Sequence, residues 1–534
     1  MLSRGRLLLA GAGVVVLAAG AAAVLLRAGV AAPSASIEPD PAALTRVLVS
    51  GQGAHIQSVR AVGPHGAAIP ISVRDGRVWP KGRLPVGQKI VVTATIARTA
   101  PVSWVLGSTF RVVRAVRTPR ARLASRWVEV KDGDPVQLSF AAHVSRVSLR
   151  SGKHRSLRTL QGHARSLTLD GNVSAAGART VLVAAAPRSW EALPAPVPVT
   201  WFAAGGLPKL VATPRPGAAG LQPGLPLRLT FSRPISEIFG TQMPTLTPRT
   251  PGSWRTVDAH TLAFVPRGTG YGLDAKIKVV LPRAVQLAGR PKGTRSLTWS
   301  GALGSTLRLQ QLLAHLGYLP VTWLPRAADV EPTVAAQQLA AIHPPAGHFS
   351  WVFENAPSTL RKLWRPGFIT SVTQGAVMAF QAQHGLKVDG FAGPLVWHDL
   401  IEATIHARGN PDGYSYVLVR KSTPQSITLW HNGAVILSGP SNTGIPQAPT
   451  PEGTFPVYLR LRSQTMSGTN PDGSHYADAG IKWISYFHQG DAIHGFNRSS
   501  YGSPQSLGCV ELPVSEAAQV YPYTPIGTLV TIAP

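Results

Sequence analysis

The chain has 534 residues and carries 52 lysines and arginines against 24 aspartates and glutamates, which gives a formal net charge of +28. Its one cysteine, Cys509, excludes an internal disulfide framework, and the sequence shows neither an aromatic RNA-binding motif nor a helix-turn-helix signal. The 47 prolines and 53 glycines predict several domains joined by short linkers. Because the positive charge is spread along the chain, it favours general affinity for anionic surfaces, with compositional drift toward Arg, Ala, Pro and Gly as the alternative explanation.

The N-terminus carries two arginines, Arg4 and Arg6, followed by an uncharged run from Leu7 to Leu26. Twenty helical residues span about 30 Å, the thickness of one bilayer core. Since the arginines favour an inside N-terminus, we expect residues 1–35 to form a cytoplasmic tip and a signal anchor, with the rest of the chain outside. Cleavage near Ala31, which would give a secreted protein, is the alternative.

Short alternating runs broken by Gly, Pro and Asp follow from about residue 36 to residue 204. Such period-two runs predict two β-sandwich modules, at residues 36–116 and 117–204. A third β-unit, at 206–299, contains the apolar alternating runs Leu227–Phe231, Thr261–Pro266 and Ile277–Pro282, and it resembles a bacterial immunoglobulin-like domain. We expect these modules to act as a stalk for the domains that follow.

A helical pattern begins near Ser305, where Leu309, Leu312, Leu313 and Leu316 recur at the spacing of an amphipathic helix. Residues 303–405 resemble the peptidoglycan-binding helical domain found beside cell-wall enzymes. The stretch 320–370, rich in Pro and Trp, is predicted to be an insertion between its two parts.

The last part of the chain, residues 412–534, is predicted to be rich in β-strands. Ile427–Trp430 and Ala434–Leu437 flank Asn432-Gly433, a strong signal for a hairpin. The expected fold class is therefore multidomain and mainly β, with a membrane anchor, tandem β-sandwich modules, a small helical domain and a β-rich C-terminal domain.

Cys509 and His494 are the candidate reactive residues of this C-terminal part. Both look like residues at strand edges joined by a loop, so an imidazole at His494 could take the proton of the thiol. Gly508, directly before the cysteine, leaves room for an acyl group and lets nearby N–H groups point at an oxyanion. A packed cysteine beside an unrelated histidine is the alternative.

The motifs around this pair resemble the L,D-transpeptidase catalytic domain. His494-Gly495 precedes Ser506-Leu507-Gly508-Cys509 at the separation seen in that family, and Asn442-Thr443-Gly444 and Thr450–Phe455 match two upstream segments. The sequence departs from the family at Leu507, where histidine is usual, and at Glu511, where arginine is frequent.

The resemblance implies a two-step acyl transfer on peptidoglycan stem peptides. Cys509 forms a thioester with the donor, and His494 acts as base and then acid, held by the Gly495 carbonyl. The N–H groups of Gly508 and Cys509 are the implied oxyanion donors. We expect neither a metal nor another cofactor, because no His, Cys and Asp spacing would hold one. The expected substrate contacts are Ser506, Leu507, Trp483, Tyr486, Phe487 and Asn497, while His475 and His488 are further candidates for such contacts.

Two other classes of function remain open. One is a cysteine L,D-carboxypeptidase or hydrolase that gives the same acyl-enzyme to water, and the other is a non-catalytic peptidoglycan-binding protein. The expected partners are stem peptides, glycan strands, anionic wall polymers and the membrane through residues 7–26. The expected location is the cell membrane, with the C-terminal domains outside the cytoplasm.

Overall fold

The computed structural model describes residues 32–131, 133–169, 177–240, 242–283, 285–288 and 295–534. They form two compact units: one contains the described residues up to Leu210 together with residues 231–233 and 285–288, and the other contains the remaining described residues. Among the described residues, no helix has the length and apolar character needed to span a bilayer. The predicted anchor at residues 7–26 lies outside them.

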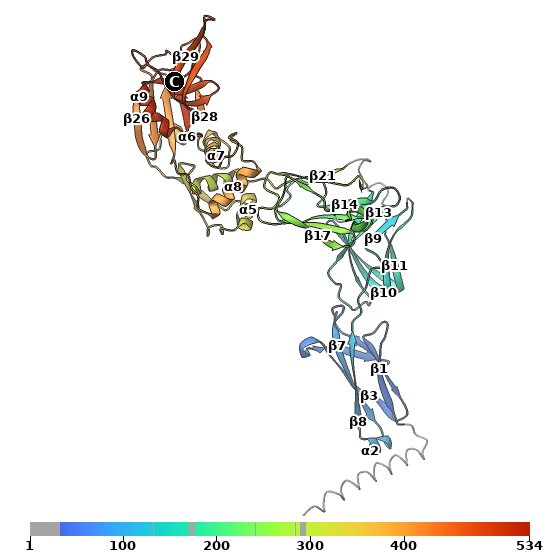
Figure 1. Cartoon of the computed structure of the whole chain (residues 1–534). Helices are drawn as coiled ribbons and strands as arrows, with labels where there is room; N and C mark the ends of the chain where they lie inside the picture. The colour runs from blue at the N-terminus through green and yellow to red at the C-terminus, as the bar shows by residue number, and fades with distance from the viewer. Residues whose placement is uncertain (1–31, 132, 170–176, 241, 284, 289–294) are drawn as a thin grey trace, which may run out of the picture. The chain divides into compact units, whose positions relative to one another are not determined.

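The first β-module has two four-stranded sheets that enclose a core containing Val78, Ile90 and Ile96. These side chains are fully buried, because alternate residues of each strand face inward. Figure 1 labels several of these strands at the blue end of the chain. The sheet orders are β1-β2-β6-β5 and β4-β3-β7-β8, with β1 Ser34–Glu38, β2 Thr45–Ser50, β3 Ala54–Val62, β4 Ala68–Ile69, β5 Ile71–Arg74, β6 Arg77–Pro80, β7 Lys89–Arg98 and β8 Thr109–Arg117, and with the short helices η1 Pro64–Gly66 and α2 Val102–Leu106.

The second module differs from a sandwich, since its described strands form one five-stranded sheet. Its two longest strands pair with register shifts between Ser139 and Arg146, and such bulges bend a strand and increase its twist. A single bent sheet can thereby surround a core that includes Trp201 and Val147. The order is β11-β10-β12-β13-β9, with β9 Trp127–Val130, β10 Val136–Ser151, β11 His154–Leu169, β12 Ala178–Ala186 and β13 Val197–Ala203.

The third β-region contains two sets of antiparallel pairs. In one set β18 lies between β15 and β17, and in the other β19 lies between β16 and β21. The bounds in this region are β14 Lys209–Thr213, β15 Leu227–Phe231, α3 Ile235–Phe239, β16 Leu246–Thr247, β17 Gly252–Asp258, β18 Thr261–Pro266, β19 Lys276–Val280, β20 Gln286–Leu287 and β21 Ser296–Ser300.

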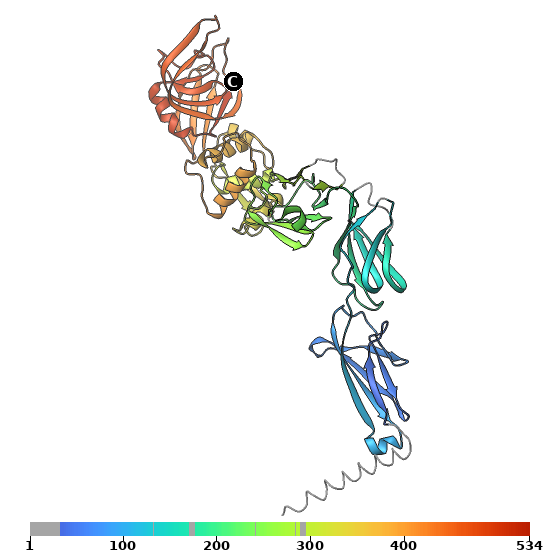
Figure 2. The ribbon, with the colours of Figure 1, turned by 45° about the vertical axis from the view of Figure 1, so that its right-hand side comes forward.

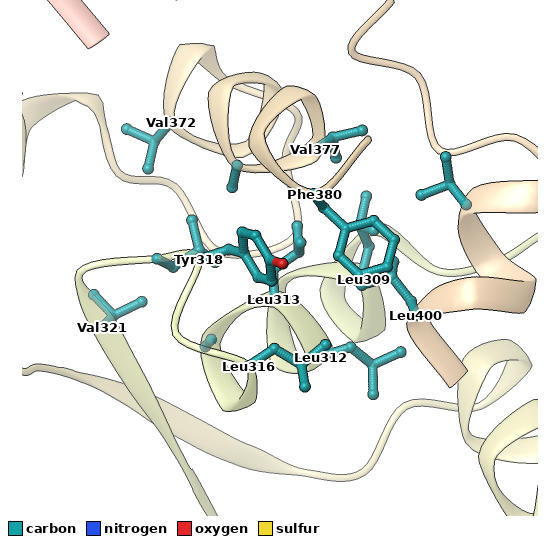
Figure 3. Packing of buried hydrophobic residues seen from close by; sticks show 14 of the residues in the cluster. Leu309, Leu312, Leu313, Leu316, Tyr318, Val321, Val372, Val377, Phe380 and Leu400 are labelled. Carbon is teal, nitrogen blue, oxygen red and sulfur yellow. The ribbon is translucent and has the colours of Figure 1, made fainter. Parts of the chain in front are cut away.

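The helical region packs around the predicted leucine stripe. Leu309, Leu312 and Leu313 of α4 are buried, which confirms their assignment to a core. Figure 3 shows Tyr318 and Phe380 among these leucines, and their rings meet edge to face with centroids 5.4 Å apart. The elements are α4 Thr306–His315, β22 Val321–Pro325, α5 Val334–Ile342, β23 Gly347–Trp351, α6 Ser358–Leu363, α7 Ser371–Gln383 and α8 Pro394–Ile405. The predicted insertion at 320–370 therefore contains an antiparallel pair of strands, β22 with β23, and two helices, of which α5 lies between the two strands in the chain.

The C-terminal domain has two sheets, and its strands appear in orange and red in Figures 1 and 2. One sheet has the order β26-β25-β24-β32-β27, with β24 Ser415–Arg420, β25 Ser426–His431, β26 Ala434–Pro440, β27 Gly453–Pro456 and β32 Leu529–Ala533. The other has the order β28-β29-β30-β31, with β28 Leu459–Thr469, β29 His475–His488, β30 Asp491–Gly495 and β31 Val510–Leu512. Helices α9 Val514–Val520 and η2 Tyr521–Tyr523 follow β31.

Buried side chains from both sheets form one core in this domain. Val417 and Leu429 of the first sheet share it with Ile493 and Val510 of the second. The predicted hairpin is confirmed, since β25 and β26 pair antiparallel across Asn432-Gly433, both of which have positive φ. The core fixes the positions of β30 and β31, from which the candidate reactive residues project.

Candidate active site

Strands β30 and β31 bring the two candidate reactive residues to one place. The strands pair in parallel, with Ile493 opposite Val510 and His494 opposite Glu511. Cys509 directly precedes Val510, so it lies at the entrance of β31, and a loop of fourteen residues returns from His494 to it. A parallel pair requires such a long return connection, which explains the separation seen in the sequence.

His494 is buried, and its tautomer follows from its hydrogen bond. Its Nδ1 lies 3.3 Å from the carbonyl oxygen of Gly495. Because a carbonyl can only accept, Nδ1 carries the proton and Nε2 has the free lone pair of a base. Burial lowers the pKa of His494, and the carbonyl and Glu511 only partly oppose that effect. The imidazole is therefore neutral at neutral pH.

Cys509 is a thiol in the resting site. Burial of its sulfur raises the pKa of Cys509 to about 12, with further contributions from the charges of Asp491 and Glu511, while the Ala492 amide opposes the rise. A neutral thiol therefore shares the cavity with a neutral imidazole, and His494 is still expected to take the thiol proton. Such a pair reacts when the histidine removes the proton during attack, which is general-base catalysis.

Both residues line one cavity of about 1080 Å³ that is open to solvent. A cavity of that volume matches the upper range of small-molecule sites and can hold part of a peptide. Its walls come from β28, β29, β30 and the loop before β31. Apolar lining is supplied by Ile481, Tyr486, Phe496 and Leu507.

The loop before the cysteine is held by side chains from two directions. Ser506 Oγ donates to the Cys509 carbonyl at 2.6 Å and accepts from the Gly508 N–H at 3.3 Å. Thr450 Oγ1 donates to the Gly508 carbonyl at 2.8 Å. The Gly508 N–H, an expected oxyanion donor, is thus engaged with Ser506 through a bond at the long end of the normal range.

The upstream motif Asn442-Thr443-Gly444 supports the loop that precedes Cys509. Asn442 and Glu511 exchange backbone hydrogen bonds of 3.1 and 3.0 Å, and the Asn442 side chain accepts from the Gly502 N–H at 3.0 Å. The Gly444 N–H donates to Thr450 Oγ1 at 2.8 Å. These motif residues are buried, so their part in the site is to hold the loop rather than to touch a substrate.

The expected substrate contacts divide into two groups. Ser506, Leu507 and Tyr486 line the cavity. Trp483 and Phe487 face the opposite side of β29 and pack against the core, and Phe487 is 3% exposed. Side chains alternate along a strand, so Trp483 and Phe487 point away from Tyr486. A local irregularity at Trp483, with φ 59°, interrupts this alternation in the part of β29 that precedes Trp483.

The residues that line the cavity do not include the other two candidate histidines, His475 and His488. Asn497 is exposed and is not among the residues that line the cavity. His475 is exposed on β29, where its Nδ1 lies 3.3 Å from Thr469 Oγ1. His488 contacts Asp491 and lies against the ring of Phe455, with ring centroids 4.7 Å apart.

Sequence reasoning missed four charged residues that line the cavity, Arg498, Asp491, Asp472 and Asp478. Arg498 forms an ion pair with Glu511, the residue that departs from the family pattern. Glu511 was the available signal in the sequence for Arg498, because a buried carboxylate requires a cation nearby. Asp491 gave no such signal, since its place beside Gly508 depends on the pairing of β30 with β31.

Comparison with known proteins agrees with this geometry. Residues 414–532 match the YkuD family model, described as the L,D-transpeptidase catalytic domain, and residues 365–400 match the model of a peptidoglycan-binding domain. A Bacillus licheniformis protein, YkuD, assigned as an L,D-transpeptidase, is 28% identical over 126 residues, which cover 23% of this chain and 70% of that protein.

Two solved structures of L,D-transpeptidases are similar to parts of this chain. The catalytic domain of an Enterococcus faecium L,D-transpeptidase is 26% identical, with coverage of 22% of this chain and 95% of that one and a TM-score of 0.21. An L,D-transpeptidase from Mycobacterium smegmatis is 12% identical, with coverage of 62% and 100% and a TM-score of 0.21. The chain therefore carries an L,D-transpeptidase catalytic domain together with a peptidoglycan-binding domain, and it is a peptidoglycan L,D-transpeptidase that acts outside the cytoplasm or in the wall.

Proposed function

We propose that this enzyme joins peptidoglycan stem peptides, or attaches another amine to them, through a thioester on Cys509. The observation that carries the proposal is that Cys509 and His494 line one open cavity from neighbouring parallel strands. His494 has its Nδ1 proton committed to the Gly495 carbonyl, so Nε2 is the atom that can accept the thiol proton.

The first half-reaction forms the acyl-enzyme. His494 takes the proton from Cys509 as the sulfur attacks the carbonyl of the L,D peptide bond in the donor stem. It then gives that proton to the departing amine of the terminal D-residue. We assign the Cys509 N–H as an oxyanion donor, and the Gly508 N–H joins it once its long bond to Ser506 is exchanged.

The second half-reaction releases the product. An amine of a second stem attacks the thioester, and the Cys509 thiol is regenerated. Apolar side chains such as Leu507 and Tyr486 would limit access of water, which favours transfer over hydrolysis. The peptidoglycan-binding domain would raise the local concentration of acceptor stems by holding glycan strands nearby.

The same proposal includes how the enzyme is held at the wall. Residues 7–26 would anchor it in the membrane, and the β-modules would extend the catalytic domain toward the wall. The net charge of +28 would add affinity for anionic wall polymers.

One experiment tests the chemistry. The full-length protein is treated with a carbapenem and, separately, with tetrapeptide muropeptides, and the protein and products are identified by mass. We expect one adduct per chain, none in Cys509→Ala, and cross-linked dimers as products. An adduct on Cys509→Ala would refute the assignment of the nucleophile, whereas formation of tripeptide alone at high acceptor concentration would establish the hydrolase.

Removal of the base gives a second readout in the same assay. His494→Ala should slow acylation by roughly 100-fold or more, the usual contribution of a general base. His475→Ala is the matched control, since that histidine is exposed on β29. Equal losses in the two variants would show that His494 is not the base.

A further inference from the structure

Asp491 is a carboxylate that lies beside the nucleophile and has no part in the chemistry described above. It is the first residue of β30 and lines the cavity together with Cys509. Its side chain is 18% exposed, so one part contacts solvent and the rest is packed. The neighbouring Gly490 places its carbonyl oxygen 3.9 Å from Cys509 Sγ.

The two oxygens of this carboxylate have different surroundings. Oδ2 accepts a hydrogen bond from His488 Nδ1 at 3.0 Å. Oδ1 faces Gly508, so closely that a Cβ added to this glycine would lie 2.2 Å from it. His488 thus fixes the orientation of the carboxylate, while the other oxygen is directed at the residue next to the nucleophile.

The charges of the cavity wall point to the kind of group that Asp491 meets. Four carboxylates line it, from Asp472, Asp478, Asp491 and Glu511, against one arginine that is already paired with Glu511. This lining is opposite in sign to the chain as a whole, which has an excess of 28 positive charges. A cavity lined in this way attracts a cation.

We propose that Asp491 receives the acyl acceptor: its carboxylate binds the protonated amine of the second substrate and removes one proton from it before the amine attacks the thioester. The inference rests on the proposed function, because it needs a thioester on Cys509. It adds a residue for the acceptor within the cavity that also holds Cys509 and His494.

The step balances in atoms and charge. An ammonium group loses its first proton to Asp491, which passes the proton to water. The free amine nitrogen then forms a bond to the thioester carbonyl carbon and loses its second proton to His494. As the carbon–sulfur bond breaks, His494 gives that proton to the departing sulfur, which restores the thiol of Cys509 and the neutral imidazole.

Burial supports this role of Asp491 as a base. It raises the pKa of Asp491, and the hydrogen bond and charge of His488 oppose the rise only in part. A carboxylate with a raised pKa is a stronger base, provided that it is still ionised at neutral pH. Asp491 does not activate Cys509, because its negative charge raises the pKa of the thiol. The position of Asp491 is therefore better explained by the second half-reaction than by the first.

The test separates the two half-reactions by offering two amines to the acyl-enzyme of the full chain. Ethylamine is protonated at neutral pH, whereas trifluoroethylamine has the same skeleton and is largely uncharged. The donor is a tetrapeptide muropeptide, and the two amides are quantified by mass. The variants are Asp491→Asn and a control, Asp399→Asn, which breaks a similar pair in the helical domain, where His398 Nδ1 lies 2.8 Å from Asp399 Oδ1.

We expect Asp491→Asn to form the acyl-enzyme at least as fast as the wild type, because the negative charge that it removes raises the pKa of Cys509 in the wild type. Ethylamide formation should fall by roughly 100-fold relative to trifluoroethylamide formation. Asp399→Asn should keep the wild-type ratio of the two amides. An unchanged ratio in Asp491→Asn would overturn the inference. A parallel loss of acylation and of both amides would also overturn it, because that pattern indicates a structural role.

A second measurement applies if Asp491→Asn does not fold. The wild-type ratio of ethylamide to trifluoroethylamide is compared with the ratio for aminolysis of a small thioester in the same buffer. A higher ratio on the enzyme supports the acceptor site, and an equal ratio refutes it. Absence of any acyl-enzyme in the wild type would instead refute the proposed function, so the two failures are distinguishable.

Discussion

Arg498 holds the Glu511 carboxylate with two hydrogen bonds, from Nε to Oε2 at 2.9 Å and from Nη2 to Oε1 at 2.7 Å. Glu511 is almost fully buried on β31, opposite His494, while the arginine side chain is 29% exposed. The arginine also lies over the ring of Phe496, with its Cζ 4.5 Å from the ring centroid. The pair therefore ties the first part of the active-site loop to the strand that follows the nucleophile.

Breaking this pair should destabilise the domain. Arg498→Ala leaves a buried carboxylate without its cation, which costs about 3–5 kcal/mol in comparable pairs, and the partial exposure of the arginine favours the lower end. The free energy of unfolding, measured with urea, should fall by about 3 kcal/mol. In the double variant with Glu511→Gln the loss should be smaller than the sum of the single losses. Strict additivity would show that the two residues do not interact in solution.

The rate of acylation should depend on pH through His494. Burial lowers the pKa of His494, so the imidazole stays neutral and able to accept a proton somewhat below the usual histidine range. The rate should hold through that range and fall only as pH drops through the lowered pKa, because protonation removes the base. The pKa of Cys509, raised to about 12, predicts no alkaline limb from the thiol below that pH. Stopped-flow acylation by a carbapenem measures the profile, and a fall centred above the usual range would contradict the assignment.

Gly508 should not tolerate a side chain. Its φ is +115°, and an added Cβ would lie 2.2 Å from Asp491 Oδ1. The backbone conformation alone costs roughly 1–3 kcal/mol for a residue other than glycine, so Gly508→Ala should lower the free energy of unfolding by at least that amount. Gly490→Ala is the matched control, since nothing lies within 4 Å of its added Cβ. Equal effects of the two substitutions would argue against the packing described for Asp491.

Leu507 should influence how much acyl-enzyme goes to water. It lies directly between the loop-holding Ser506 and Gly508 and lines the cavity. Leu507→Ser should admit water and raise the share of free tripeptide over dimer, by roughly fivefold if the two barriers change by about 1 kcal/mol relative to each other. The products are separated and weighed by mass spectrometry. An unchanged share would show that Leu507 does not exclude water.

The N-terminal segment gives a prediction that concerns location. The protein expressed whole should fractionate with membranes and begin near Met1, because residues 7–26 have the length of a bilayer span. Cell fractionation followed by N-terminal sequencing provides the measurement. A soluble form that begins near Pro33 would favour cleavage instead.

Local signals in the sequence predicted the features that depend on interactions between residues close together in the chain. The Asn432-Gly433 hairpin and the leucine stripe of α4 follow from turn chemistry and helical periodicity, and both are confirmed. The return of Cys509 to His494 was predicted from motif spacing, and the pairing of β30 with β31 provides it.

Features that depend on strand register were not predictable in the same way. Trp483 and Phe487 look like cleft residues in the sequence because they surround Tyr486, but a single strand sends neighbours to opposite faces. Their direction depends on the irregularity at Trp483, which has no local signal. The pairing of Arg498 with Glu511 and the position of Asp491 likewise depend on long-range contacts.

The hydrogen bond from His494 to the Gly495 carbonyl has a consequence for how the site can be lost by mutation. In catalytic sites where a carboxylate orients the histidine, one substitution removes the acceptor. Here the acceptor belongs to the main chain, so no substitution deletes it. A side chain at Gly495 could displace it only by pushing β30, because an added Cβ would lie 3.0 Å from Val514 Cα and 3.3 Å from Ala517 Cβ of α9. The path of the backbone therefore sets the orientation of the His494 imidazole. A substitution can change that orientation only by disrupting the contact between β30 and α9.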